Sequence, residues 1–146
     1  MSSEKRKIAY IDGKPYEIGA NHTSILKFVK SYVGEKKVPT LCDDPNLAPY
    51  GACRVCSVEV ALEKDGPTKM VASCHTPVAE NQHIFTSNEA ITNLRKNIVE
   101  LVLTDHPMEC DSCEVNNNCE LQTVANDLGI SDHRYNSPKQ HKGIPR

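Results

Sequence analysis

The seven cysteines of this 146-residue chain fall into two groups, and these groups limit what the chain can fold into. The first group follows the spacing C-x10-C-x2-C-x17-C and consists of Cys42, Cys53, Cys56 and Cys74. The second follows C-x2-C-x5-C and consists of Cys110, Cys113 and Cys119. An odd number of cysteines does not suit a secreted disulfide framework, and the N-terminus has no apolar signal-peptide core. We therefore expect a cytoplasmic protein whose reduced thiols bind metal.

The charge and hydropathy of the chain exclude several classes of function. The 17 basic residues are balanced by 19 acidic residues, so no basic surface points to nucleic acid. The longest apolar run, residues 98–103, contains Glu100 and is far too short to span a bilayer. We expect neither nucleic-acid binding nor direct membrane insertion. Only 38% of the residues are hydrophobic, so metal centres would help to stabilise a small core.

The first 85 residues predict a small mixed sheet with one helix packed on it. Residues 7–18 alternate between apolar and polar side chains around Asp12-Gly13, which favours a hairpin. Pro15 places the second strand of this hairpin at a sheet edge, because proline cannot donate a backbone hydrogen bond. Further strands are predicted at residues 55–62, 70–73 and 83–86.

The one helix of this part is predicted over residues 22–34. Thr23 or Ser24 can cap its first turn, and Gly34 can end it. Three apolar residues share the face that would pack on the sheet: Leu26, Val29 and Val33.

From residue 86 onwards the pattern becomes helical. Thr86 followed three residues later by Glu89 is typical of a capping box. Apolar residues then recur at helical spacing: Ile91, Leu94, Ile98, Leu101 and Val102. Residues 119–129 predict a second helix that ends at Gly129, with a shared apolar face of Leu121, Val124, Ala125 and Leu128. The polar tail from Ser131 is expected to run extended.

The first cysteine group favours a two-iron, two-sulfur cluster. The plant-type pattern is C-x4-C-x2-C…C, and the present spacing differs by a longer first gap. Gly51 and Ala52 would let backbone N–H groups approach the inorganic sulfurs. Arg54 is either a plain surface charge or an N–H donor and charge partner beside the cluster. A four-cysteine zinc site normally contains two C-x2-C knuckles, whereas this group has one. Zinc and structural thiols remain the alternatives.

The second cysteine group supplies three thiolates and lacks a fourth. His106 stands four residues before Cys110, and Pro107 directs the chain out of the preceding helix. His106 either completes a three-cysteine, one-histidine metal centre or only ends the helix, where the helix dipole stabilises it. Zinc suits such a ligand set as well as iron does.

The two groups together resemble the N-terminal region of the large iron–sulfur subunit of respiratory complex I. The same region recurs in NAD-linked hydrogenases, iron-only hydrogenases and NAD-dependent formate dehydrogenases. The matching stretches are PTLC…GACRVCSVEV, ASCHTPV, RKNIVELVL and HPMECDSCEVNNNCELQ. The resemblance implies an α+β fold, with a β-grasp ferredoxin-like domain at residues 1–85 and a small helical His/Cys cluster-binding domain at residues 86–146.

The resemblance also implies both cofactors and their ligands. A [2Fe-2S] cluster would be held by Cys42, Cys53, Cys56 and Cys74. A [4Fe-4S] cluster would be held by His106, Cys110, Cys113 and Cys119. The loop before the last cysteine usually carries glycines in this family, and here it reads Asn116-Asn117-Asn118. Asparagine tolerates a left-handed backbone, so the loop is expected to form.

These resemblances lead us to expect an electron-transfer subunit of a cytoplasmic, NADH-linked oxidoreductase complex. Its expected partners are an NADH- and flavin-binding iron–sulfur subunit and a catalytic redox subunit. The chain ends soon after the second cysteine group, so we expect no catalytic domain and no catalytic residues of its own. The alternative is a zinc-stapled interaction module without redox function.

Overall fold

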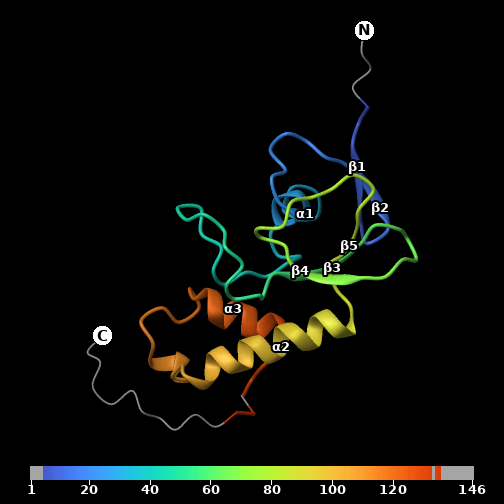
Figure 1. The fold of residues 1–146 in the computed structure, drawn as a ribbon. Coiled ribbons are helices and arrows are strands. Elements are labelled where there is room, and N and C mark those ends of the chain that lie inside the picture. The colour runs from blue at the N-terminus through green and yellow to red at the C-terminus, as the bar shows by residue number, and fades with distance from the viewer. Residues whose placement is uncertain (1–4, 133, 136–146) are drawn as a thin grey trace.

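The computed structural model describes residues 5–132 and 134–135, and it combines a five-stranded mixed sheet with helices (Figure 1). The strands are β1 (Ile8–Ile11), β2 (Lys14–Glu17), β3 (Ser57–Ala61), β4 (Lys69–Ala72) and β5 (His83–Phe85). The helices are α1 (Ile25–Val33), α2 (Glu89–Thr104), the short 3-10 helix η1 (Cys110–Ser112) and α3 (Glu120–Asp127). The expected α+β class is confirmed. Most of the predicted polar tail lies outside the described residues.

The sheet has the strand order β2-β1-β5-β3-β4. β1 and β5 run parallel, and the other neighbouring pairs run antiparallel. The predicted hairpin is confirmed, because Asp12 and Gly13 adopt the positive φ angles of 48° and 86° that a tight β-turn requires. Pro15 lies in β2, which is an edge strand as predicted.

Helix α1 has the predicted cap and end, although it begins at Ile25 and not at residue 22. The hydroxyl of Ser24 accepts a hydrogen bond from the N–H of Lys27, and Gly34 ends the helix with a φ of 105°. The buried face consists of Ile25, Leu26, Phe28 and Val29. The prediction was wrong for Val33, which is 38% exposed because it is the last residue of the helix.

Helix α2 is capped by a residue other than the predicted one. The side chain of Asn88 accepts a hydrogen bond from the N–H of Ile91 at 2.8 Å, so Asn88 is the N-cap. The hydroxyl of Thr86 instead donates to the carboxylate of Asp12 at 2.6 Å, and the Thr86 N–H donates to the same carboxylate at 2.9 Å. Thr86 therefore ties the first hairpin to the end of β5 and does not cap α2.

The buried residues of α2 differ from the apolar repeat that predicts the helix. Residues spaced four apart are buried, namely Ile91, Arg95, Val99 and Leu103. Leu101 is 54% exposed and Val102 is 41% exposed, although both belong to the apolar repeat that predicts this helix. The apolar pattern misled the prediction because one position of the buried row is occupied by an arginine.

Two hydrophobic clusters stabilise the fold. The first lies between the sheet and α1 and includes Ile11, Phe28, Val58 and Ile84. The second brings α2 and α3 together through Val99, Leu103, Val124, Ala125 and Ile130, and Figure 1 shows these two helices side by side. Val55, from the loop that carries the first cysteine group, is also part of the second cluster.

The predicted end of α3 is confirmed. Gly129 has a φ of 69°, and the N–H of Ile130 donates to the carbonyl of Ala125 at 2.9 Å. This hydrogen bond, together with the one from Gly129 to Asn126, forms a Schellman motif. Among the described residues, no helix is both long enough and apolar enough to cross a membrane.

Candidate metal centres

The fold brings the four cysteines of the first group into one neighbourhood. Cys42 and Cys53 are half-buried, whereas Cys56 and Cys74 are buried. Their thiols interact in two pairs, Cys42 with Cys53 and Cys56 with Cys74. A further electrostatic interaction links Cys74 to Cys42. Cys74, which follows β4, therefore meets the loop between α1 and β3 that carries the other three.

Backbone N–H groups approach the sulfurs of this group. The N–H of Cys53 donates to Sγ of Cys42 at 3.5 Å, and the backbone of Ala52 also interacts with Cys42. The backbone of Gly51 interacts with Cys74 in the same way. Gly51 and Ala52 thus lie with their backbones beside two sulfurs. Iron–sulfur clusters are tuned by hydrogen bonds to their sulfurs, so the residues present fit this cofactor.

The pKa values of these thiols are perturbed in opposite directions. Burial raises the pKa of Cys74 to about 12, and the neighbouring sulfur of Cys56 adds to this effect. Burial also raises the pKa of Cys42. Burial acts in the same direction on Cys53, yet the pKa of Cys53 is lowered because hydrogen bonds from the Val55 backbone and the Cys42 thiol stabilise its thiolate. A bound metal would reverse the effect of burial, because a cation deprotonates its thiol ligands.

The cysteine loop requires glycine at position 51. Gly51 has a φ of 68°, and a Cβ atom there would lie 3.0 Å from the ring of His75. Arg54 also has a positive φ, of 64°, and its side chain is exposed. The carbonyl of Arg54 accepts hydrogen bonds from the N–H and the hydroxyl of Ser57. The expected charge interaction of Arg54 with a cluster stays a prediction.

The second cysteine group occupies the segment that joins α2 to α3. The N–H of His106 donates to the carbonyl of Leu103 at 3.1 Å, at the end of α2. Cys110 begins η1, and the N–H of Cys113 donates to the carbonyl of Cys110 at 3.0 Å. Cys119 is the N-cap residue of α3. His106 and Cys113 are exposed, while Cys110 and Cys119 are half-buried.

The two groups differ in how far the fold assembles them. Within the part of the chain that the structure describes, no three His, Cys, Asp or Glu side chains come close enough to hold a single metal ion. The first group is nevertheless assembled as two pairs of thiols. The ligands predicted for the second group share one segment but do not surround a common point. Three thiols and an imidazole are donors that suit a four-iron cluster or zinc.

The asparagine run before Cys119 forms an ordered turn. Asn117 has a φ of 63°, so the expectation that an asparagine takes a left-handed conformation here is confirmed. Its N–H donates to the side-chain oxygen of Gln122 at 2.8 Å. The side-chain amide of Gln122 donates in turn to Asn116 at 2.9 Å. These bonds hold the turn against the first turns of α3.

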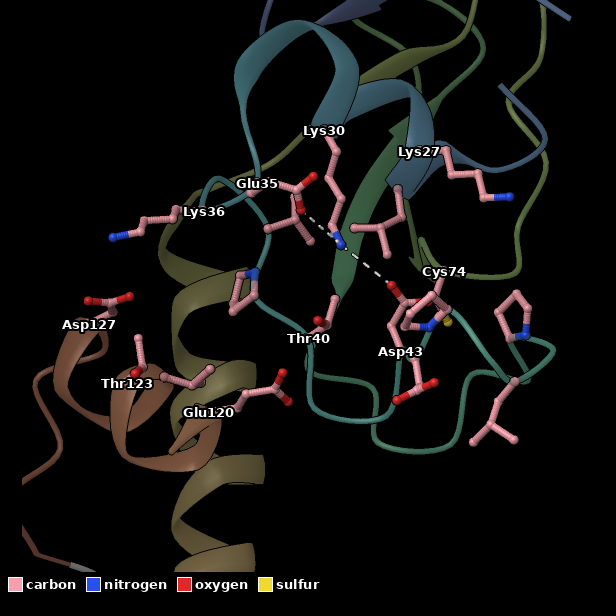
Figure 2. Close-up of a pocket in the computed structure, with 18 of the residues that line it drawn as sticks. Lys27, Lys30, Glu35, Lys36, Thr40, Asp43, Cys74, Glu120, Thr123 and Asp127 are labelled. Carbon is pink, nitrogen blue, oxygen red and sulfur yellow. Dashed lines mark hydrogen bonds and ion pairs between the residues drawn. The ribbon is translucent and has the colours of Figure 1, made fainter. Parts of the chain in front are cut away.

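A groove of about 790 Å³ lies between α1, the loop after it and α3 (Figure 2). Cys74 of the first group and Cys119 of the second both line this groove. Figure 2 shows Lys30 reaching into it, with Nζ 3.3 Å from Glu35 and 3.4 Å from Asp43. One candidate ligand from each group therefore faces the same space.

Sequence reasoning missed one buried charge beside the first group. Arg95 on α2 is 5% exposed and donates hydrogen bonds to carbonyls on both sides of Cys56. A signal was present in the sequence, because Arg95 stands four residues from both Ile91 and Val99. That spacing places it on the buried face of the helix.

The paired thiols of the first group and the cysteine segment between α2 and α3 are donors that suit iron–sulfur clusters, and the comparisons with known proteins place the chain among iron–sulfur proteins. Two family descriptions match the chain. The description "2Fe-2S iron-sulfur cluster binding domain" matches residues 7–89, and "NADH-ubiquinone oxidoreductase-G iron-sulfur binding region" matches residues 95–134. The chain therefore belongs to the 2Fe-2S iron-sulfur cluster binding domain family, and it also contains the NADH-ubiquinone oxidoreductase-G region.

Several curated proteins are similar over most of the chain. The alpha subunit of an NADPH-Fe(3+) oxidoreductase from Geobacter sulfurreducens is 34% identical over 134 residues, which are 92% of this chain and 15% of that protein. A subunit of the NADH-quinone oxidoreductase from Escherichia coli is 34% identical over 133 residues, 90% of this chain and 14% of that protein. The HndD subunit of an NADP-reducing hydrogenase from Solidesulfovibrio fructosivorans is 37% identical over 131 residues, 86% of this chain and 21% of that protein.

A solved structure shares the fold. A chain in the crystal structure of an NAD+-reducing [NiFe]-hydrogenase in the H2-reduced state superposes with a TM-score of 0.73 at 22% identity. The match covers 96% of this chain and 54% of that chain. The expected relationship to the large iron–sulfur subunit of complex I is confirmed, and so are the two expected cofactors, a [2Fe-2S] and a [4Fe-4S] cluster.

Proposed function

We propose that this protein relays electrons between an NAD(H)-oxidising flavin subunit and a catalytic subunit of a cytoplasmic oxidoreductase complex. The observation that carries the proposal is the arrangement of Cys42, Cys53, Cys56 and Cys74 as two interacting pairs of thiols. Two pairs suit a two-iron cluster, in which each iron takes two protein ligands. We assign the [2Fe-2S] cluster to these four residues.

We assign the [4Fe-4S] cluster to the helical part of the chain, with His106, Cys110, Cys113 and Cys119 as ligands. Iron–sulfur clusters, once bound, accept and release single electrons. The groove that both Cys74 and Cys119 line supports a relay, since one proposed ligand of each set lies beside the same space. The imidazole of His106 carries no negative charge, which favours the reduced form of its cluster relative to a fourth thiolate.

The nature of the metal separates an electron relay from a zinc-stapled interaction module. We expect the protein purified without oxygen to be brown, with iron and acid-labile sulfide in the amounts of one two-iron and one four-iron cluster. A colourless protein that contains stoichiometric zinc and no acid-labile sulfide would show that the relay assignment is wrong. The measurement requires only metal and sulfide analysis of the purified chain.

The replacement His106→Cys tests the fourth ligand of the second set. We expect the variant to keep a four-iron cluster with a lower midpoint potential. The decrease should be at least about 59 mV, which is a tenfold change in the equilibrium constant for one electron. The added thiolate charge disfavours reduction. Redox titration followed by electron paramagnetic resonance measures the shift. His75→Ala is the control and should leave the four-iron potential unchanged. An unchanged potential in His106→Cys would count against His106 as a ligand.

The proposed partners are tested with NADH. The relatives named above are subunits of enzymes whose names refer to NADH, NADPH or NADP, which supports a nucleotide-linked electron donor. We expect NADH to bleach the visible absorption of the native complex isolated without oxygen, and dithionite to bleach the purified chain. Rapid bleaching of the purified chain by NADH alone would contradict the need for a separate flavin subunit.

A further inference from the structure

Arg95 lies buried between α2 and the loop of the first cysteine group. Only 5% of its surface is exposed to solvent. Nε donates to the carbonyl of Val55 at 3.2 Å, and Nη2 donates to the carbonyl of Ser57 at 2.8 Å. These two carbonyls flank Cys56, which is 1% exposed. One guanidinium therefore holds the backbone on both sides of a candidate cluster ligand.

The charge of Arg95 lies beside Cys56, because the guanidinium binds the carbonyls of Val55 and Ser57 on either side of it. Burial lowers the pKa of Arg95 to about 10, and the Cys56 sulfur acts in the opposite direction by favouring the charged form. The guanidinium therefore remains charged at neutral pH. None of the ion pairs formed among the described residues involves Arg95. A buried cation is costly unless its surroundings compensate it, and here two backbone carbonyls accept its hydrogen bonds.

We propose that Arg95 is a positioning residue for the two-iron centre, which fixes the peptide around Cys56 and makes the bound cluster easier to reduce. The proposal rests on the assignment of Cys56 as a cluster ligand. A cluster gains one negative charge when it accepts one electron, and a fixed cation in a low-dielectric site stabilises that charge. Solvent and salt weaken the same effect for an exposed cation.

The location of Arg95 also connects the two centres. α2 spans Glu89–Thr104, and the segment with the second cysteine group follows directly after it. The hydrogen bonds from Arg95 join this helix to the loop of the first group across 40 and 38 residues of sequence. Arg95 therefore contributes to the relative placement of the two candidate ligand sets.

Three variants of the full chain, purified with their clusters, test the role of Arg95. Arg95→Gln removes the charge, and Arg95→Lys keeps the charge but cannot span both carbonyls. The control Lys64→Gln removes an exposed charge in the segment between β3 and β4, outside both cysteine groups. The readout is the midpoint potential of the two-iron signal in electron paramagnetic resonance, titrated with dithionite and ferricyanide in the presence of mediators. The second readout is the rate at which an iron chelator removes the cluster.

We expect Arg95→Gln to shift the reduction equilibrium at least tenfold towards the oxidised form, about 59 mV for one electron. In Arg95→Lys, the equilibrium constant for reduction of the two-iron cluster should stay within twofold of that of the unaltered protein. The chelator should remove the cluster several-fold faster. Lys64→Gln should change neither value by more than twofold. A two-iron potential that is unchanged in Arg95→Gln would overturn the proposal.

If Arg95→Gln binds no cluster, Arg95→Lys tests whether Arg95 positions the two-iron centre. A wild-type potential combined with faster cluster loss would then support the proposal, and a tenfold lower potential in Arg95→Lys would overturn it. Failure of the ligand assignment has a different signature, because the unaltered protein would then show no two-iron signal. The two hypotheses are therefore separated by the first spectrum.

Discussion

At the scale of single residues, the first cysteine loop depends on a backbone conformation that residues with a side chain rarely adopt. Gly51 combines a φ of 68° with the ring of His75 at 3.0 Å from where its Cβ would lie. Gly13 has a similar φ of 86°, but a Cβ there would meet nothing within 4 Å. A comparison of alanine replacements at Gly13 and Gly51 therefore separates the cost of the left-handed backbone from the cost of the steric contact.

The replacement Gly51→Ala should therefore destabilise the protein more than Gly13→Ala. The left-handed conformation alone costs a non-glycine residue about 1 to 2 kcal/mol, which is the loss expected for Gly13→Ala. Gly51→Ala adds the contact with His75 and displaces a backbone group beside Cys74, so it should also lower the acid-labile sulfide content. Chemical denaturation and sulfide analysis measure the two effects. Equal losses in both variants, with full sulfide content, would show that the contact is unimportant.

At the scale of secondary structure elements, the sequence predicts where helices form better than how they are rotated. The helical periodicity of residues 91–102 predicts α2, but the buried row runs through Arg95 and Val99, and Leu101 faces solvent. Hydrophobic periodicity treats an arginine as exposed, so it rotates the predicted face. Cap residues show a similar limit, since several candidates lie close together before Glu89 and a tertiary contact occupies Thr86.

The replacement Asn88→Ala tests the observed cap of α2. Loss of the hydrogen bond to the N–H of Ile91 should lower the free energy of unfolding by about 1 kcal/mol. Ser87→Ala is the control, because Ser87 is exposed and precedes the cap, and it should stay within about 0.5 kcal/mol of the unaltered protein. Thermal and urea denaturation give both values. A larger loss in Ser87→Ala than in Asn88→Ala would contradict the cap assignment.

At the scale of the whole molecule, the second hydrophobic cluster joins the two cysteine groups. Val55, which lies between two candidate ligands, packs in the same cluster as Val99 and Leu103 of α2 and Val124 of α3. The predicted division into residues 1–85 and 86–146 stays a prediction. The shared cluster nevertheless means that a defect in the helical part reaches the loop of the first cysteine group.

The replacement Leu103→Ala should destabilise both parts of the chain. Leu103 is 3% exposed, and removal of such a side chain costs about 2 to 5 kcal/mol. Leu101→Ala is a matched control on the same helix, since Leu101 is 54% exposed and its loss should change stability by about 0.5 kcal/mol or less. Denaturation should be followed by the two-iron signal and by helix circular dichroism. A two-iron signal that survives unchanged in Leu103→Ala would show that the two parts are stable independently.

The sequence by itself determined the chemistry and most of the elements. Cysteine spacing indicated two metal-binding groups, and Asp12-Gly13, Ser24 and Gly129 gave the first hairpin, the start of α1 and the end of α3. These signals are local, because turns, caps and ligand loops depend on residues within a few positions of one another.

Only the tertiary structure decided which distant residues meet. Thr86 binds Asp12 across 74 residues, and Arg95 binds the carbonyl of Ser57 across 38. Such contacts depend on the order in which strands pair and on how α2 packs against the sheet, and residues far apart in the sequence set both. The burial of Arg95 beside Cys56 follows from that packing. Arg54, the arginine that the sequence analysis named, is exposed.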